Sequence, residues 1–169
     1  MDRTLKKKVA IRGNKGFTLI ELLTVIAMIG IIAAIAIHKF NRISEAASIS
    51  EDMHKISVYF KEKRLKAFTE KTELQISINS AGDELKSELI DSAGNVTALD
   101  GKLFLGNPIR PANEVYKINT RGLVYDAENI YLATSTTITL ETCLAINDTR
   151  IVIGKAGKDG GGNDICNPL

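Results

Sequence analysis

One carboxylate stands in an otherwise uncharged run of the chain. Glu21 is the only residue with a formal charge from Phe17 to Ile37, a stretch of 21 residues. At ~1.5 Å per helical residue this run reaches ~31 Å, close to the thickness of the hydrocarbon core of a bilayer. An acid in such a helix costs roughly 2.5 to 3.5 kcal/mol at its centre, so we expect it to have a cationic partner. A cut between Gly16 and Phe17 would free an amine four residues from Glu21 that can serve as this partner.

The segment ahead of this run is strongly basic. Residues 1–16 hold six Lys or Arg residues against one acid, a net charge of +5. This charge predicts that the leader stays on the cytoplasmic side and that the rest of the chain crosses the membrane. In a secretory signal the apolar segment precedes the cleavage site and is discarded with it. Here a cut after Gly16 would remove only the leader, whereas the alternative is an uncut signal-anchor helix with Glu21 at the membrane interface.

The residues from Gly16 to Ile37, G-F-T-L-I-E-L-L followed by T-V-I-A-M-I-G-I-I-A-A-I-A-I, resemble the type IV prepilin signature. The resemblance implies that a membrane-embedded prepilin peptidase cleaves between Gly16 and Phe17 and then methylates the amine of Phe17. It also implies assembly with other pilin or pseudopilin subunits, at an inner-membrane platform, into a filament of the pilus or type II secretion class. In a staggered bundle, Glu21 of one subunit would pair with Phe17 of its neighbour and set the axial register. Major pilins usually carry a proline where this chain has His38, which favours a minor subunit over a major type IV pilin.

The charge and length of the remaining chain limit its function and its domains. After the leader, 153 residues carry 16 basic and 19 acidic side chains, a net charge of −3 that gives no argument for nucleic-acid binding. The part beyond the helix is long enough for one modest core but not for two domains. We expect a leader over 1–16 that is removed, an assembly helix over 17–70 with its transmembrane segment at 17–37, and a β-rich periplasmic domain over 71–169.

A long helix is predicted by the spacing of apolar side chains. Neither Gly nor Pro occurs between Gly30 and Gly82, and apolar residues recur at steps of three, four or seven: Ala46, Ile49, Met53, Ile56, Phe60 and Ala67. One helix from about Phe17 to Phe68 should therefore pack this stripe on the globular domain. The polar positions between these residues should form a solvated face: Glu51, Asp52, Lys55, Lys61, Glu62, Lys63 and Lys66.

Beyond Thr69 the pattern changes to strands. Leu74, Ile76 and Ile78 alternate with polar residues, as in a half-buried strand, whereas Asp83–Ser92 is interpreted as a short helix or an irregular loop. Further strands are predicted at Val115–Asn119, Leu123–Asp126, Ile130–Ala133, Thr136–Glu141 and Arg150–Ile153, with a hairpin turn at Thr120–Gly122. The fold class is α+β: a long N-terminal helix, transmembrane in its first half, packed on a small antiparallel β-sheet or β-sandwich.

Two cysteines near the C-terminus suit a disulfide. Cys143 and Cys166 enclose 22 residues, and export to an oxidising compartment favours a bridge worth roughly 3 kcal/mol. Zinc would need two further ligands, but both histidines, His38 and His54, lie on the predicted helix. We therefore expect no metal and no cofactor. The glycine-rich stretch 154–162 is predicted to be flexible and lacks the Gly-Lys-Ser/Thr ending of a phosphate-binding loop.

A second resemblance covers the rest of the chain, to minor pseudopilins of the GspH/FimT type. It rests on the helix end Arg64–Ala67, the strand Glu73–Ile78, the hairpin Ile118–Leu123, the strand Thr136–Leu140 with Cys143, and Arg150–Ile153 before Gly157-Lys158. The family fold is a long helix carrying a β-sandwich, and its members act at filament tips or in initiating assembly. Some FimT-like members bind DNA through Gly-Arg-x-Arg, where this chain has Gly157-Lys158-Asp159-Gly160, with one base lost and an acid gained. Lys155 and Lys158 are thus weak candidates for DNA binding, and nucleic acid is an unfavoured partner.

No arrangement typical of an enzyme stands out. His54 has no matched Ser or Cys motif, and the adjacent acids Glu51-Asp52 and Asp83-Glu84 point apart, which suits a solvated surface rather than acid–base catalysis. The chain is therefore predicted to be a structural minor pilin or pseudopilin, anchored in the inner membrane and its lipid before it enters a filament. The alternative is a DNA-binding or adhesive minor pilin at a pilus tip.

Overall fold

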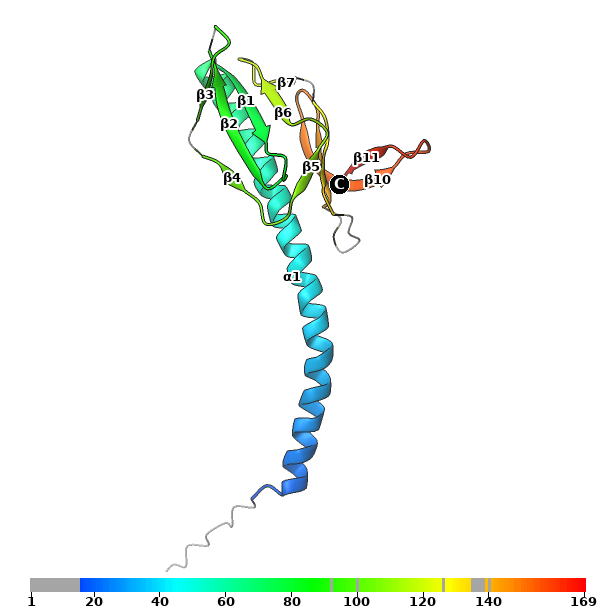
Figure 1. Cartoon of the computed structure of the whole chain (residues 1–169). Coiled ribbons are helices and arrows are strands. Elements are labelled where there is room, and N and C mark those ends of the chain that lie inside the picture. The colour runs from blue at the N-terminus through cyan, green and yellow to red at the C-terminus, as the bar shows by residue number, and fades with distance from the viewer. Residues whose placement is uncertain (1–15, 92, 100, 126, 135–138, 140) are drawn as a thin grey trace, which may run out of the picture. The chain divides into compact units, whose positions relative to one another are not determined.

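One helix is followed by a series of short strands. The computed structural model describes residues 16–91, 93–99, 101–125, 127–134, 139 and 141–169. Within them lie α1 (Leu19–Glu70), β1 (Glu73–Ile78), β2 (Glu84–Ile90), β3 (Val96–Ala98), β4 (Leu103–Phe104), β5 (Ile109–Pro111), β6 (Val115–Ile118), β7 (Val124–Tyr125), β8 (Ile130–Leu132), β9 (Cys143–Ile146), β10 (Ile151–Lys158) and β11 (Asp164–Pro168) (Figure 1). The chain divides into an N-terminal unit that ends at Phe40 and a globular unit, Asn41–Leu169.

The strands form two antiparallel sheets in the globular unit. The first has the order β3-β2-β1-β6-β7, with β4 also paired to β2, and the second has the order β11-β10-β9-β8-β5. In β1, Leu74, Ile76 and Ile78 are buried and alternate with more exposed residues, so this predicted strand is confirmed. Its partners run antiparallel on both sides, β2 on one and β6 on the other.

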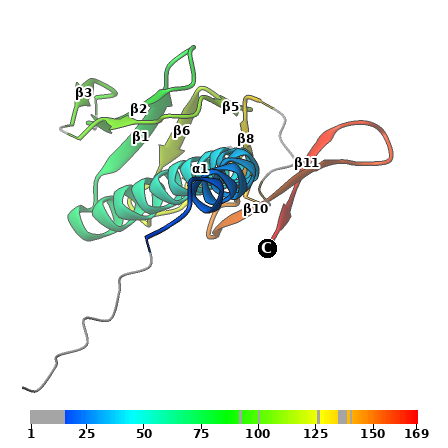
Figure 2. The same ribbon diagram turned by 90° about the horizontal axis from the view of Figure 1, so that it is seen from below.

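The core lies between the second half of α1 and both sheets. Ile49, Met53, Ile56, Phe60 and Ala67 are all buried along the predicted stripe of α1. Most of this stripe shares one hydrophobic cluster with residues of both sheets, and β1 and β6 lie alongside α1 in Figure 2. The aromatic rings of Phe60 and Tyr116 meet edge to face, with centroids 5.3 Å apart. The predicted α+β fold, a long helix packed on antiparallel strands, is confirmed.

Four hairpins close with the same local sequence, an Asn or Asp three residues before a glycine. The pairs are Asn79 and Gly82, Asp91 and Gly94, Asn119 and Gly122, and Asp159 and Gly162. Each glycine has a left-handed φ between +73° and +86°, and its amide donates to the main-chain carbonyl of its Asn or Asp at 2.8–3.0 Å. The side-chain oxygen of each Asn or Asp also accepts amide protons of its own loop. The turn at Thr120–Gly122 is one of these four and is confirmed.

The segment from Asp83 to Ser92 was predicted wrongly. It contains strand β2 rather than a helix or a loop, and its core-facing residues are Leu85, Ser87 and Leu89. The two leucines are four residues apart, a spacing that fits both a helical face and an alternating strand. Their pairing with β1 decides between the two.

Two charged residues of α1 are buried, in contrast to the predicted solvated face. Asp52 is 2% exposed, and its Oδ2 accepts both the main-chain amide and the side-chain amide of Asn107 at 2.8 Å. Lys63 is 5% exposed and lies with its ammonium over the ring of Tyr59. Both positions are covered by the chain that connects β3 to β5, whose course the sequence pattern does not show.

The C-terminal third contains more strand than predicted. β10 continues through Gly154 to Lys158, so the first part of the predicted flexible loop is a strand paired with β11. β9 is buried at all four positions, which leaves no alternation for a sequence pattern to detect. The strand predicted at Thr136–Glu141 falls largely on residues 135–138 and 140, outside the described part of the chain.

Candidate processing and assembly segment

The start of α1 is defined by Thr18. Gly16, Phe17 and Thr18 precede the helix, which begins at Leu19. The hydroxyl oxygen of Thr18 accepts the amide proton of Glu21 at 3.3 Å, and its carbonyl oxygen accepts that of Leu22 at 3.2 Å. This is an N-cap, and Thr18 with Glu21 three residues later has the sequence of a capping box. The Gly16–Phe17 peptide bond therefore lies outside the helix, just ahead of its cap.

The apolar half of α1 is exposed along its whole length. Every residue from Gly16 to Ile37 is exposed, and Phe17 reaches 84%. Within the described residues, α1 is the one helix long and apolar enough to cross a membrane, with a mean hydropathy of 2.7 over its apolar window. An apolar surface of this extent indicates a membrane or a protein partner, because soluble monomers rarely leave one uncovered.

Glu21 lies in the first turn of α1, near the positive end of the helix dipole. A carboxylate in this place stabilises the helix. None of the ion pairs among the described residues involves Glu21. The carbonyl oxygen of Glu21 accepts the hydroxyl proton of Thr24 at 2.8 Å, one turn further along.

The same residues carry a known processing motif. Residues 11–37 match the prokaryotic N-terminal methylation motif. The match supports a type IV pilin-like protein that prepilin peptidase processes and that assembles with other pilins. It spans Gly16, Phe17 and Glu21 and ends at Ile37, ahead of the globular unit. Neither a curated protein nor a solved structure matches the chain. The motif and the apolar helix of this chain suit membrane anchoring.

The two cysteines join neighbouring parts of the second sheet. Cys143 of β9 and Cys166 of β11 form a disulfide, with their Cα atoms 5.8 Å apart. The bridge passes over β10, where Gly154 is the residue paired with Cys143. The disulfide therefore ties the last strand, β11, to the buried strand β9.

Lys155 and Lys158 line one pocket of 350 Å³ together with Arg110. Lys158 Nζ lies 2.6 Å from Asp164 Oδ1, and Arg110 pairs with the other oxygen of that carboxylate. These two cations, Lys158 first, hold the pKa of Asp164 below its ordinary value. Arg110 was not among the predicted site residues, because it lies on β5, far along the chain from β10, and no local motif connects the two.

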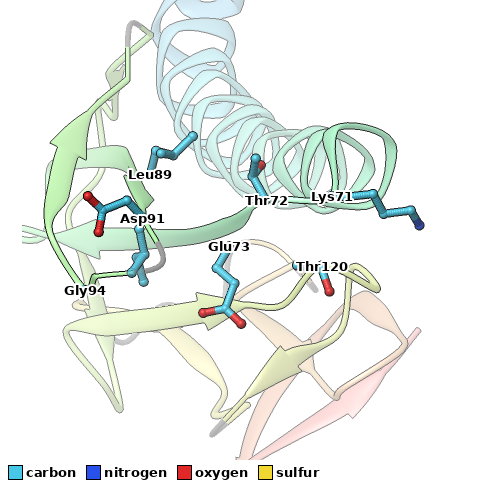
Figure 3. Close-up of a pocket in the computed structure, with 8 residues that line it drawn as sticks. Lys71, Thr72, Glu73, Leu89, Asp91, Gly94 and Thr120 are labelled. Atoms are coloured by element: carbon cyan, nitrogen blue, oxygen red, sulfur yellow. The ribbon is translucent and has the colours of Figure 1, made fainter.

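A larger hollow of 620 Å³ lies where α1 ends. Figure 3 shows Glu73 and Asp91 among its lining residues, with their carboxylates pointing apart. The Asp91 carboxylate accepts hydrogen bonds within its own turn, and those from Asn95 lower its pKa. Within the described residues no group of three His, Cys, Asp or Glu side chains is placed to hold a metal ion.

The contact around His54 is structural. His54 Nε2 lies 3.4 Å from Glu141 Oε1, and the Ser50 hydroxyl donates to the other oxygen of the same carboxylate. Because Ser50 donates to Glu141 rather than to the imidazole, the three residues do not form the nucleophile and base of a hydrolase. They connect α1 to the chain ahead of β9, and the methylation motif likewise favours a structural protein over an enzyme.

Proposed function

We propose that this protein is a structural pilin-like subunit, a minor pilin or pseudopilin, of a type IV pilus or type II secretion filament. The observation that carries the proposal is the Gly16–Phe17 bond, which lies outside the helix and directly ahead of its exposed apolar half. A cut at this bond leaves α1 joined to the globular unit. The mature chain is then held in the inner membrane by its helix, with the C-terminal domain in the periplasm.

Assembly uses the same helix. The exposed apolar side chains between Phe17 and Ile37 lose contact with lipid and pack against neighbouring subunits. This apolar packing does not by itself fix the axial offset between one subunit and the next. The pair between Glu21 of one subunit and the N-methylated amine of Phe17 in the next fixes this offset, because only one offset leaves neither charge unpaired in an apolar surrounding. The partners are other pilins, the assembly platform and membrane lipid.

The globular unit supports a minor subunit. Two antiparallel sheets share one core with the second half of α1, which suits the β-sandwich on a long helix that the GspH/FimT resemblance implies. A role at the filament tip or in initiating assembly follows from that resemblance.

The N-terminus of the native protein tests the processing. Mass spectrometry of protein recovered from cells that make it should show a chain that begins at N-methylated Phe17. A mature protein that still begins at Met1, or that begins well beyond Ile37, would contradict the proposal.

The substitution Glu21→Val tests the assembly role. We expect the variant to be inserted and cut at the normal level but to enter filaments poorly, because the neighbouring amine is left without its counter-charge. Leu22→Val, a change of one exposed apolar residue in the same turn, serves as the control and should assemble normally. Normal incorporation of Glu21→Val would refute the ion pair.

A DNA-binding or adhesive minor pilin at a pilus tip is the second candidate. The convergence of Arg110, Lys155 and Lys158 on one pocket favours it, whereas the pairing of two of these cations with Asp164 weakens it. If it holds, the processed protein in detergent should retard duplex DNA, and the double substitution Lys155→Ala and Lys158→Ala should abolish this. Absence of retardation by the wild-type protein leaves the structural subunit as the function.

A further inference from the structure

We infer that Thr18 positions the peptide bond that prepilin peptidase cuts, by holding the start of α1 at Leu19. This role rests on the proposed cleavage between Gly16 and Phe17. The methylation motif marks the segment that is processed, whereas the capping contact shows how this chain keeps the bond accessible.

The N-cap fixes the residue at which the helix begins, and it also stabilises the first helical turn. An N-cap residue has a non-helical backbone, and its side chain replaces the carbonyl that the first helical amides lack. In this chain the Thr18 hydroxyl takes the amide proton of Glu21, while the Thr18 carbonyl already accepts that of Leu22. Growth of the helix toward Phe17 would break the contact with the hydroxyl.

Without the hydroxyl, the equilibrium between a helix that begins at Leu19 and a longer helix shifts toward the longer one. The Glu21 amide would then lack its acceptor in apolar surroundings, and an additional helical turn would supply a backbone carbonyl instead. Asn14, four residues upstream of Thr18 in the sequence, is the nearest preceding residue whose side chain can accept hydrogen bonds from the amides of a first helical turn. A start at Asn14 would place Gly16 and Phe17 in the first helical turn.

A helical bond is a poor substrate for proteolysis, because cleavage concentrates at exposed segments whose backbone is not held in regular hydrogen bonds. Gly16 adds to the effect of the cap, since glycine is among the weakest helix formers. Among the described residues, nothing lies within 4 Å of the place where a side chain on Gly16 would begin. Thr18 and Gly16 thus both keep the Gly16–Phe17 bond outside the helix.

The test compares three variants of the full-length, uncut protein in detergent micelles. Thr18→Val keeps the shape of the side chain but removes the acceptor, and Thr18→Ser retains it. Thr24→Val is the matched control, because it makes the same chemical change two positions beyond Leu22, where the hydroxyl donates to a carbonyl and caps no amide. Cleavage by purified prepilin peptidase is followed by mass spectrometry, and the helix start is located from the ¹³Cα shifts of Gly16 and Phe17.

We expect Thr18→Val to be cut roughly fivefold more slowly, the ratio that corresponds to the usual stability of a threonine cap. Its Gly16 and Phe17 shifts should move toward helical values, whereas Thr18→Ser and Thr24→Val should match the wild type in both measurements. Cleavage of Thr18→Val at the wild-type rate, or an equal slowing of cleavage in Thr24→Val, would overturn the role of Thr18. A wild-type chain that is not cut between Gly16 and Phe17 would overturn the proposed function, and this role with it.

Discussion

Gly154→Ala is expected to destabilise the globular unit through a clash beneath the disulfide. A Cβ atom at this position would lie inside the contact distance of the Asn167 carbonyl oxygen and 2.9 Å from Cys166 Sγ. Both atoms belong to β11, one to its backbone and the other to the bridge with Cys143, so neither can move aside as a free side chain would. Overpacking of this kind costs about 2 kcal/mol. For a unit of this size, that cost corresponds to a fall in Tm of roughly 8 °C.

Gly157→Ala is the matched control in the same strand. Its Cβ would meet Asn167 Nδ2 at 3.2 Å, the end of a side chain that can rotate away. We expect this change to alter the stability by less than about 1 kcal/mol, because the new methyl group finds room and the unfolded chain loses freedom.

Thermal unfolding of the processed protein in micelles, followed by near-ultraviolet circular dichroism, measures both variants. The cost of Gly154→Ala should shrink to about half when Cys143 and Cys166 are both replaced by alanine, since β11 can then shift. Two results would refute the reasoning: a loss in Gly154→Ala no greater than in Gly157→Ala, or an unchanged loss without the disulfide.

Three further outcomes follow from contacts of the globular unit. Reduction of the disulfide should lower the Tm of the globular unit, since a bridge over a loop of this length contributes roughly 3 kcal/mol to its stability. An unchanged Tm would contradict this. Asp52→Ala should cost about 2 kcal/mol in urea unfolding because it leaves the main-chain amide of Asn107 without its acceptor, while the side-chain amide keeps only the Ser48 hydroxyl. The exposed control Glu51→Ala should cost under about 0.5 kcal/mol. Lys158 and Arg110 lower the pKa of Asp164, so the stabilising effect of this carboxylate is present at neutral pH and is lost as the pH falls through its lowered pKa. The protection factors of the β11 amides should therefore fall in acid in the wild type but not in Asp164→Asn, and an equal fall in both would count against the ion pairs.

The long helix and its buried stripe were predictable because both depend on local spacing. Met53, Ile56 and Phe60 occupy one face of any regular helix, so their burial needed only a surface to pack on. The processing segment is equally local, and the methylation motif spans the residues predicted for it, although the roles of Gly16, Phe17 and Glu21 stay predictions.

The strand pairings were only partly predictable. Leu85 and Leu89 fit a helix as well as a strand, and β9 shows no alternation because it is buried at every position. Asp52 was assigned to a solvated face since its partner, Asn107, lies 55 residues away. Contacts of this kind depend on which segments the fold brings together, and neither periodicity nor composition carries that information.

The sequence by itself predicted a cut between Gly16 and Phe17, and it determined which segment is long and apolar enough to cross a membrane and where a lone acid lies within it, because these features depend on neighbouring residues. Only the tertiary structure decided that Gly154 lies beneath the disulfide and that Arg110 meets Lys158 at one carboxylate. Those contacts join strands far apart in the sequence, and they form because burial of a shared core selects one pairing of the strands over all others.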